Sequence, residues 1–304
     1  MDSVLARDDR MVHGKIPNEE SERLYALGFI HEKGSMSFYL RIITNNGNVE
    51  TDQLKQVMAL ANTYGNGTVT LSSDKAIEVR GIAYEDTEDA MKFCEEQGLI
   101  TGGTGNHVRP IMVYEQDSRY NQIIDPYDVA DKLRKLFFLR LKKENLPNKM
   151  EIAVGGGPNG CSELKTYDIG IEGVEVPSFD MELCRGCLNC SVQRNCKKGA
   201  VLVGNGELFV NNLKCDKCGE CVGKCPFGVT THSTKAYRIY IGGRHGNCVR
   251  EGIRLSRLLT AEESLFSVID RLIFLFQEMG QEGEEFADTI ARIGVDTVER
   301  KVLA

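Results

Sequence analysis

The chain has 304 residues, of which 41% are hydrophobic and 27% charged, a composition typical of a globular protein and not of a disordered one. Its formal net charge of −7 excludes a general nucleic-acid coat, because neutralising phosphates requires a surplus of Lys and Arg. The beginning of the chain is charged, and the longest apolar stretch is interrupted by Asp270 and Arg271. We therefore expect no membrane segment and a cytoplasmic protein.

The first 100 residues divide into two parts. Residues 1–34 show no firm period and are interpreted as an N-terminal arm, whereas residues 35–100 form a compact unit. Apolar periodicity in this unit predicts strands over 36–43, 69–71 and 77–82, with helices over 52–64 and 87–97.

A second unit spans 101–175 and 232–304. Its pattern predicts an extended segment over 108–114, a helix over 126–143, and strands over 150–154, 167–172 and 237–241. The chain then ends in helices, one around 265–276 and one over 284–302. Residues 176–231 interrupt the unit as an inserted module. The predicted fold class is therefore α+β, with two α+β halves and an insertion.

The inserted module holds eight of the eleven cysteines. They form two groups, Cys184-x2-Cys187-x2-Cys190-x5-Cys196 and Cys215-x2-Cys218-x2-Cys221-x3-Cys225-Pro226. The second group matches the bacterial ferredoxin run, in which the Cys before Pro serves the other of two [4Fe-4S] clusters. By that logic one cluster takes Cys184, Cys187, Cys190 and Cys225. The other takes Cys215, Cys218, Cys221 and Cys196.

Zinc is the alternative metal for these cysteines, because four-cysteine zinc sites also use CxxC knuckles. Zinc ribbons normally lack the third Cys after two further residues and the trailing Cys-Pro, so the spacing favours iron–sulfur clusters. Cys94 and Cys248 are isolated in the sequence and are expected to be free thiols.

Several segments in order resemble the siroheme-dependent sulfite and nitrite reductases, especially the compact anaerobic and dissimilatory forms with an inserted ferredoxin module. The resemblance covers residues 35–303. It is carried by 66–71 (NGTVTL) with 77–82 (IEVRGI), 102–105 (GGTG) with 108–110 (VRP), 157–161 (GPNGC) with 168–170 (DIG), and 242–246 (GGRHG). It implies an oxidoreductase with an inserted domain carrying two [4Fe-4S] clusters.

The resemblance also implies a siroheme whose iron shares a Cys with a third cluster, held by a CxxxxxC pair and a later CxxxC pair. Here residues 113–119 contain no Cys, and the later pair keeps only Cys161. We therefore expect no siroheme-coupled third cluster. Cys161 matches the residue that contacts the siroheme iron, so it is either an axial thiolate to a siroheme or related tetrapyrrole, or an idle thiol in a vestigial pocket.

The same resemblance implies cations around the tetrapyrrole and its substrate. The residues implied as catalytic are Arg80, Arg109 and Lys165. Those implied as cofactor-binding are Cys161, Arg41, Arg80, Arg109, Asn159, Arg244 and His245. Without the resemblance, each Arg by itself would be interpreted as a solvated surface charge. His107 is an alternative iron ligand or proton donor, although a lone His is usually structural.

Three functions follow as hypotheses. The first is a reductase that receives electrons from a ferredoxin-like or flavoprotein donor and passes them through two clusters to a tetrapyrrole. The second is a non-catalytic electron-transfer or regulatory subunit with an empty or vestigial pocket. The third is an enzyme that acts on a tetrapyrrole as substrate. A small anionic or tetrapyrrole ligand is expected, nucleic acid and membrane are not, and the sequence is compatible with an oligomer.

Overall fold

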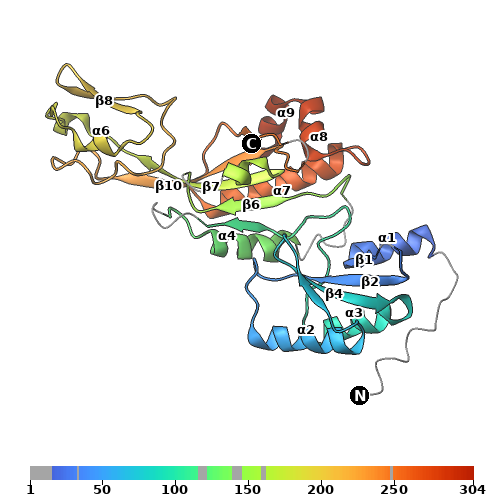
Figure 1. The fold of residues 1–304 in the computed structure, drawn as a ribbon. Helices are drawn as coiled ribbons and strands as arrows, with labels where there is room; N and C mark the ends of the chain where they lie inside the picture. Colours follow the sequence, from blue (N-terminus) through green and yellow to red (C-terminus); the bar gives the residue numbers. More distant parts are fainter. Residues whose placement is uncertain (1–15, 33, 116–121, 139–145, 159–161, 247–248) are drawn as a thin grey trace. The chain divides into compact units, whose positions relative to one another are not determined.

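The computed structural model describes residues 16–304 except 33, 116–121, 139–145, 159–161 and 247–248 (Figure 1). The chain divides into two compact units, one covering residues up to Pro110 and the other covering Ile111–Leu139 and Leu146–Ala304. Among the described residues, none of the helices combines the length and apolar character that a bilayer span requires.

The first unit is a four-stranded antiparallel sheet with helices. Its elements are α1 (Asn18–Leu27), β1 (Phe29–His31), β2 (Ser37–Ile42), α2 (Thr51–Thr63), β3 (Val69–Leu71), β4 (Ile77–Ala83) and α3 (Thr87–Glu96). The strand order is β1-β2-β4-β3. Alternate residues of β2 are buried, so Phe38, Leu40 and Ile42 enter the core with Val57 and Leu60 of α2. The opposite face of the sheet keeps its polar side chains.

The expected N-terminal arm is corrected in part. Residues 18–31, inside that arm, form α1 and β1, and β1 pairs with β2. Leu24 and Phe29 are fully buried in the same core as the sheet. No apolar period is visible here because Leu24 is the one buried residue of this ten-residue helix. The described part of the arm, 16–32, is therefore integral to the first unit.

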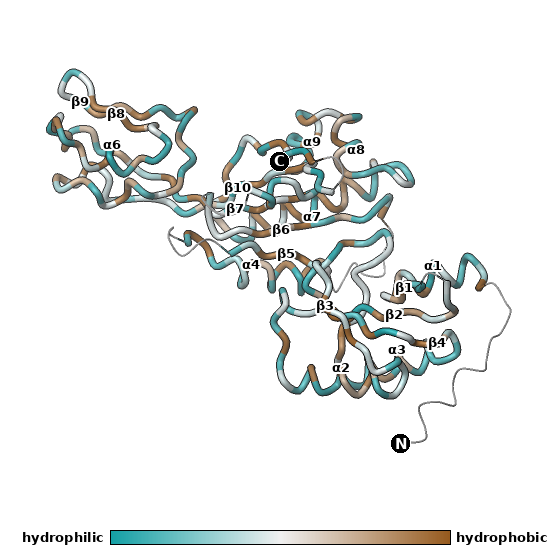
Figure 2. The backbone as a smooth tube through the Cα atoms, in the orientation of Figure 1, coloured by the Kyte–Doolittle hydropathy of each residue, from teal (hydrophilic) through white to brown (hydrophobic). Residues whose placement is uncertain are grey.

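The second unit is built on a five-stranded sheet of order β11-β10-β7-β6-β5. The strands are β5 (Met112–Tyr114), β6 (Ile152–Gly155), β7 (Ile169–Pro177), β10 (Ser233–Ile241) and β11 (Ile253–Arg254). The first three run parallel, and β10 is antiparallel to both β7 and β11. Every residue of β6 is buried, so both faces of the sheet are covered there. Figure 2 shows the corresponding hydrophobic colouring along β6 and α7.

The helices of this unit are α4 (Pro126–Leu133), continued by a π-helical turn over Arg134–Phe138, then α7 (Glu262–Met279), α8 (Phe286–Ile293) and α9 (Val295–Val302). Short 3-10 turns span Ser162–Thr166 and Met181–Leu183. The single helix expected over 284–302 is corrected to α8 and α9, because Gly294 separates them with a φ of 83°. The α+β fold class is confirmed.

The inserted module continues from two strands of this sheet. β7 and β10 stay paired as far as Pro177 and Ser233, well beyond the end of β6, and the module follows from their tips (Figure 1). It contains α6 (Ser191–Asn195) and a hairpin of β8 (Val201–Gly204) and β9 (Glu207–Val210). Its core is small, formed by Val192, Val201, Leu208, Cys221 and Val229.

Candidate functional site

The second cysteine group gathers around one small cavity of the module. Cys215, Cys218 and Cys221 line it, and Cys196 joins them from the end of the first group. The backbone N–H of Ala200 donates to Cys196 Sγ at 3.2 Å. Such N–H···S bonds are among the features that set the potential of an iron–sulfur cluster.

These thiols resist ionisation when no metal is bound. Burial, and then the neighbouring Cys218, Cys215 and Cys196, raise the pKa of Cys221 to about 12. Burial also raises the pKa of Cys218. Four thiolates that line one poorly solvated cavity need a cationic metal core to balance their charge. The donor set therefore fits a metal centre.

Three of the cysteines assigned to the other cluster pack against the same small core. Cys184, Cys190 and Cys225 pack against that core, and Cys187 is half-buried. Gly186, between Cys184 and Cys187, has a φ of 58°, and a Cβ at this position would lie 2.1 Å from the carbonyl oxygen of Gly206. The turn between the first two cysteines thus requires glycine because it passes directly over the β8–β9 hairpin.

The geometry bears on the zinc alternative. All eight module cysteines are free thiols. Within the described ranges, no three His, Cys, Asp or Glu side chains converge as the ligands of a single ion would. Soft thiolates are ligands of both iron–sulfur clusters and zinc, so the cysteine spacing in the sequence carries the choice between the two metals.

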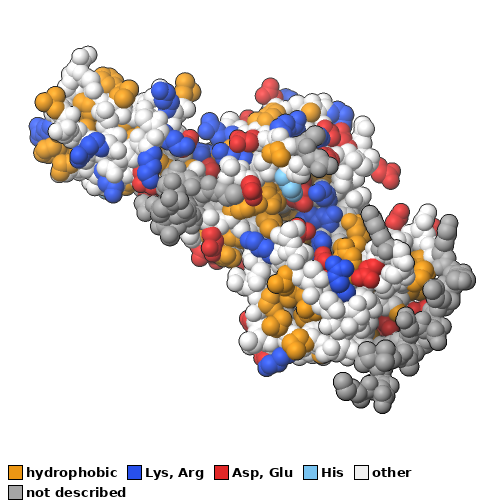
Figure 3. Space-filling model, viewed as in Figure 1, with side chains coloured by type: hydrophobic (Ala, Val, Ile, Leu, Met, Phe, Trp, Pro, Cys, Tyr) orange, Lys and Arg blue, Asp and Glu red, His pale blue; other side chains and the backbone are white. Residues whose placement is uncertain are grey.

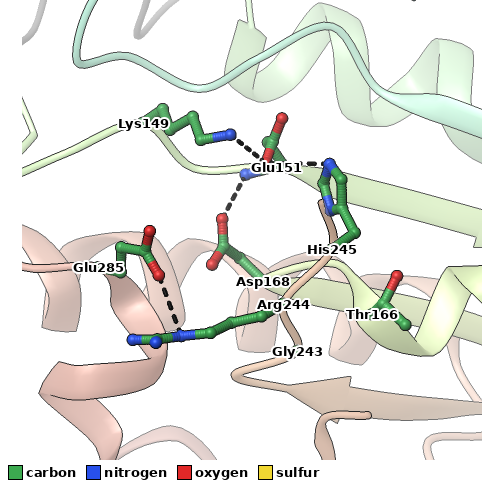
Figure 4. A pocket seen from close by; sticks show the side chains of 8 residues that line it. All are labelled: Lys149, Glu151, Thr166, Asp168, Gly243, Arg244, His245 and Glu285. Carbon is green, nitrogen blue, oxygen red and sulfur yellow. Dashed lines mark hydrogen bonds and ion pairs between the residues drawn. The ribbon is translucent and has the colours of Figure 1, made fainter. Parts of the chain in front are cut away.

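A second candidate site is a polar pocket of about 340 Å³ at the other end of the sheet (Figure 4). It is lined by Lys149, Glu151, Thr166, Asp168, Gly243, Arg244, His245 and Glu285. Glu151 precedes β6, Asp168 precedes β7 and Gly243 follows β10. Because β6 and β7 are parallel and β10 runs the other way, these three positions meet at the same end of the strands, opposite the end from which the module follows.

Ion pairs and hydrogen bonds connect the side chains of this pocket. Lys149 Nζ lies 2.8 Å from Glu151 Oε2, and His245 Nε2 lies 3.6 Å from the same oxygen. The Glu151 backbone N–H donates to Asp168 Oδ2 at 2.9 Å. On the other wall, Arg244 Nε lies 3.0 Å from Glu285 Oε2 (Figure 4).

Asp168 is the group in this pocket whose protonation is most perturbed. Burial raises its pKa to about 7, and the N–H of Glu151 opposes this shift only in part. The ring of the adjacent Tyr167 lies 4.7 Å from the ring of His245, which fixes the imidazole beside Glu151. A carboxyl group that exchanges its proton near neutral pH, beside an imidazole and two cations, can supply protons to a small ligand.

The structure divides the expected tetrapyrrole residues between the two units. Arg244 and His245 line the pocket, whereas Lys165 does not, because its Nζ lies over the Tyr240 ring, 5.4 Å from the centroid. Asn159 and Cys161 lie outside the described residues.

The remaining expected cations belong to the first unit and are already paired. Arg41 lies 3.1 Å from Glu78 and, together with Arg109, donates to the carbonyl of Gly103. Arg80 donates to Thr70 Oγ1 at 2.8 Å, and its guanidinium lies 5.2 Å from the centroid of the Tyr39 ring.

The isolated residues are placed as follows. His107 is buried in the first unit, 5% exposed. Cys94 is a buried free thiol, as expected, and Cys248 lies outside the described residues.

Of the residues that line the pocket, sequence reasoning assigned roles only to Arg244 and His245, and it missed the side chains of Lys149, Glu151, Thr166, Asp168 and Glu285. One available signal was the alternation of Lys149 and Glu151 directly before an apolar strand, which places both side chains on one face at the strand's start. Asp168 belongs to a motif that carries the family resemblance, but no role was assigned to it.

The pocket by itself does not fit the eight carboxylates of a siroheme. Its cations, Lys149 and Arg244, are paired with Glu151 and Glu285, and Asp168 adds a third carboxyl group. A polyanion would therefore meet as many acidic as basic groups. The pocket fits a smaller polar ligand.

Comparisons with known proteins agree with the two-unit architecture. Residues 104–304 match the model of the nitrite and sulphite reductase 4Fe-4S domain, and residues 30–97 match that of the nitrite/sulfite reductase ferredoxin-like half domain. The coenzyme F420-dependent sulfite reductase of Methanocaldococcus jannaschii is 27% identical over 95% of this chain, which spans 46% of that protein. The alpha subunit of the dissimilatory-type sulfite reductase of Allochromatium vinosum is 25% identical over 81% of this chain and 64% of its own length.

A solved structure of a dissimilatory sulfite reductase I has the same fold. It superposes with a TM-score of 0.66 at 17% identity, covering 88% of this chain and 69% of that one.

Proposed function

Since the chain belongs to the nitrite and sulphite reductase family, we propose that it is an iron–sulfur oxidoreductase whose inserted module carries two [4Fe-4S] clusters. A siroheme-like tetrapyrrole, with Cys161 among the residues that would hold it, would receive the electrons that a protein donor supplies to the module. The observation that carries the first part is the shared cavity of Cys196, Cys215, Cys218 and Cys221. A fully ligated cluster transfers electrons and leaves no iron open to substrate, so another group must perform the reduction.

The donor we propose is an acidic ferredoxin-like protein or flavoprotein. Residues 176–231 contain seven Lys or Arg against five Asp or Glu, although the whole chain has a net charge of −7. Figure 3 shows Lys and Arg side chains over the visible face of the module. A basic module on an acidic chain attracts an acidic carrier and speeds their encounter at low salt.

We assign the polar pocket to a small ligand and its protons. Lys149 and Arg244 offer positive charge to a small anion, and Asp168 and His245 line the same pocket, where they would supply the protons that reduction of such an anion consumes. A siroheme supplies an iron that binds the substrate and accepts electrons. Arg41, Arg80, Arg109, Lys165 and Asn159 remain proposed as its partners.

Anaerobic preparation followed by analysis of iron, sulfide, zinc and extractable tetrapyrrole tests this proposal. We expect about eight irons from the clusters, one further iron with a macrocycle, and no stoichiometric zinc. The macrocycle spectrum should change in Cys161→Ala and stay unchanged in Cys94→Ala, the matched variant at a buried thiol of the first unit. Zinc in place of iron would refute the clusters, and a spectrum indifferent to Cys161 would refute the axial ligand.

A second candidate is a non-catalytic electron-transfer or regulatory subunit. It is favoured by the lack of Cys in residues 113–119 and at Gly157, where the family's coupled cluster takes its other three ligands. Two intact clusters without any macrocycle would support it. The third hypothesis, a tetrapyrrole as substrate, predicts an altered ring after incubation with siroheme and a strong reductant. An unchanged ring would refute it.

A further inference from the structure

The loop of the second cysteine group is fastened to the sheet. The backbone N–H of Glu175, on β7, donates to the carbonyl of Lys217 at 2.8 Å. The backbones of Glu175 and Cys218 form an isolated parallel β-bridge. Ser233, at the start of β10, donates to Glu175 Oε1 at 2.6 Å. Gly219 lies so close to Glu175 that a Cβ would be 2.0 Å from its carboxylate. The cavity of the second group therefore lies directly against the β7–β10 ribbon.

A buried ion pair lies where this loop meets the sheet. Glu172 on β7 and Arg238 on β10 are direct cross-strand partners, 2% and 3% exposed, with Nη1 and Oε2 2.7 Å apart. The other guanidinium nitrogen, Nη2, donates to the backbone carbonyl of Asp216 at 3.0 Å, next to Cys215. Tyr240 donates to the same Glu172 oxygen at 3.2 Å.

The position of this pair is informative. In the register, Glu172 lies opposite Gly155, the last residue of β6, after which the chain leads toward Cys161. The pair thus stands between the second cysteine cavity and the end of the strand that precedes the Cys161 loop. The first cysteine group has no comparable connection to the sheet among the described residues.

Stability does not account for this pair. Desolvating two charges costs more than their attraction commonly returns, and apolar residues of similar size usually serve as well. Within the described residues, Arg238 Nε is buried without a hydrogen-bond partner, a further cost. Arg238 is a buried cation that hydrogen-bonds to Asp216, the residue next to the ligand Cys215. Its charge strongly affects the reduction potential of a neighbouring anionic cluster, because the local dielectric screens poorly.

We propose that Glu172 and Arg238 are positioning residues that hold the loop of the second cluster and set its reduction potential. This rests on the proposed function, specifically on the two clusters. Reduction adds one negative charge to the cluster. Arg238 favours the reduced form and Glu172 opposes it, so the pair tunes the second cluster.

Two conservative substitutions test this with opposite expected signs. Arg238→Gln removes the cation, so the potential of the second cluster should fall. Glu172→Gln removes the anion, so that potential should rise. The double variant leaves no unpaired buried charge and is the safest to fold, and its potential should lie between those of the two single variants.

The readout is a redox titration of the purified full-length protein followed by EPR. The signal of the second cluster is identified as the one lost in Cys196→Ala, and the signal of the first cluster serves as the internal control. Arg134, in the π-helical turn that follows α4, forms a partly buried ion pair with Asp131 of α4. Arg134→Gln is therefore the matched variant that should move neither signal.

The outcomes separate the two proposals. Opposite shifts confined to the second cluster support the inference. Shifts of the same sign, equal shifts of both clusters, or no shift with both signals intact would overturn it while leaving the proposed function standing. A wild-type protein without cluster signals would overturn both.

Discussion

Replacing Gly186 by Ala tests the architecture of the first cysteine loop. The φ of 58° costs a residue with a Cβ about 1 kcal/mol. The new Cβ would also lie 2.1 Å from the Gly206 carbonyl oxygen and 2.5 Å from its carbonyl carbon. Both are backbone atoms, so the β8–β9 hairpin must move. Overpacking of this kind adds about 1 to 3 kcal/mol.

A total of about 2 to 4 kcal/mol is large for so small a module, because small domains bury little surface in excess of what they need to fold. We expect Gly186→Ala to lose the first cluster and keep about four of the eight irons. Iron and sulfide analysis, with EPR of the reduced protein, measures this.

Gly199→Ala is the matched control. Gly199 has a φ of 60°, and a Cβ there would meet nothing within 4 Å. This variant carries the backbone strain alone, about 1 kcal/mol, and should keep its full iron content. Equal iron content in the two variants would refute the reasoning, since the contact with Gly206 would then have no consequence.

Three further predictions concern a ligand, a titrating group and the core. Cys196→Ala should abolish the second cluster and spare the first, although Cys196 follows the first group in sequence; loss of the first signal in EPR would contradict the cross-group ligand set. Because burial raises the pKa of Asp168 to about 7, the folded state binds the proton more tightly, and stability contributed by this group falls as pH rises from about 4 to 7. Denaturation at several pH values should therefore show Asp168→Asn gaining on the wild type over that range, and a constant difference would exclude the shift. Phe286→Ala should cost about 3 to 5 kcal/mol, because this fully buried ring packs edge-on against Phe276 at 5.3 Å, whereas Phe274→Ala on the exposed face of α7 should stay within about 0.5 kcal/mol; similar denaturation midpoints for the two would contradict the assigned packing.

The fold was largely predictable where the pattern is local. The apolar alternation of β2 and the seven buried positions of α7 follow directly from the strand and helix periods. Prediction failed at α1, where burial of Leu24 alone leaves no period, and at Gly294, where one glycine divides a continuous apolar pattern into two helices.

The candidate site shows the same division. Cysteine spacing within each loop determined the chemistry of the module, because ligands of one cluster delivered by one tight turn are close in sequence. The pocket could not be read in this way. Glu151, Asp168 and His245 come from the ends of three strands and carry no shared motif.

By itself, the sequence determined the family, the eight cysteines and the two α+β halves, all of which are written in local spacing and periodicity. Cysteine spacing also predicted that Cys196 joins Cys215, Cys218 and Cys221. The tertiary structure places these four around one cavity. It alone paired Arg238 with Glu172 across 66 residues. The physical reason is that strand register, fixed by which faces of β7 and β10 are buried, brings distant positions together without leaving a periodic trace in either segment.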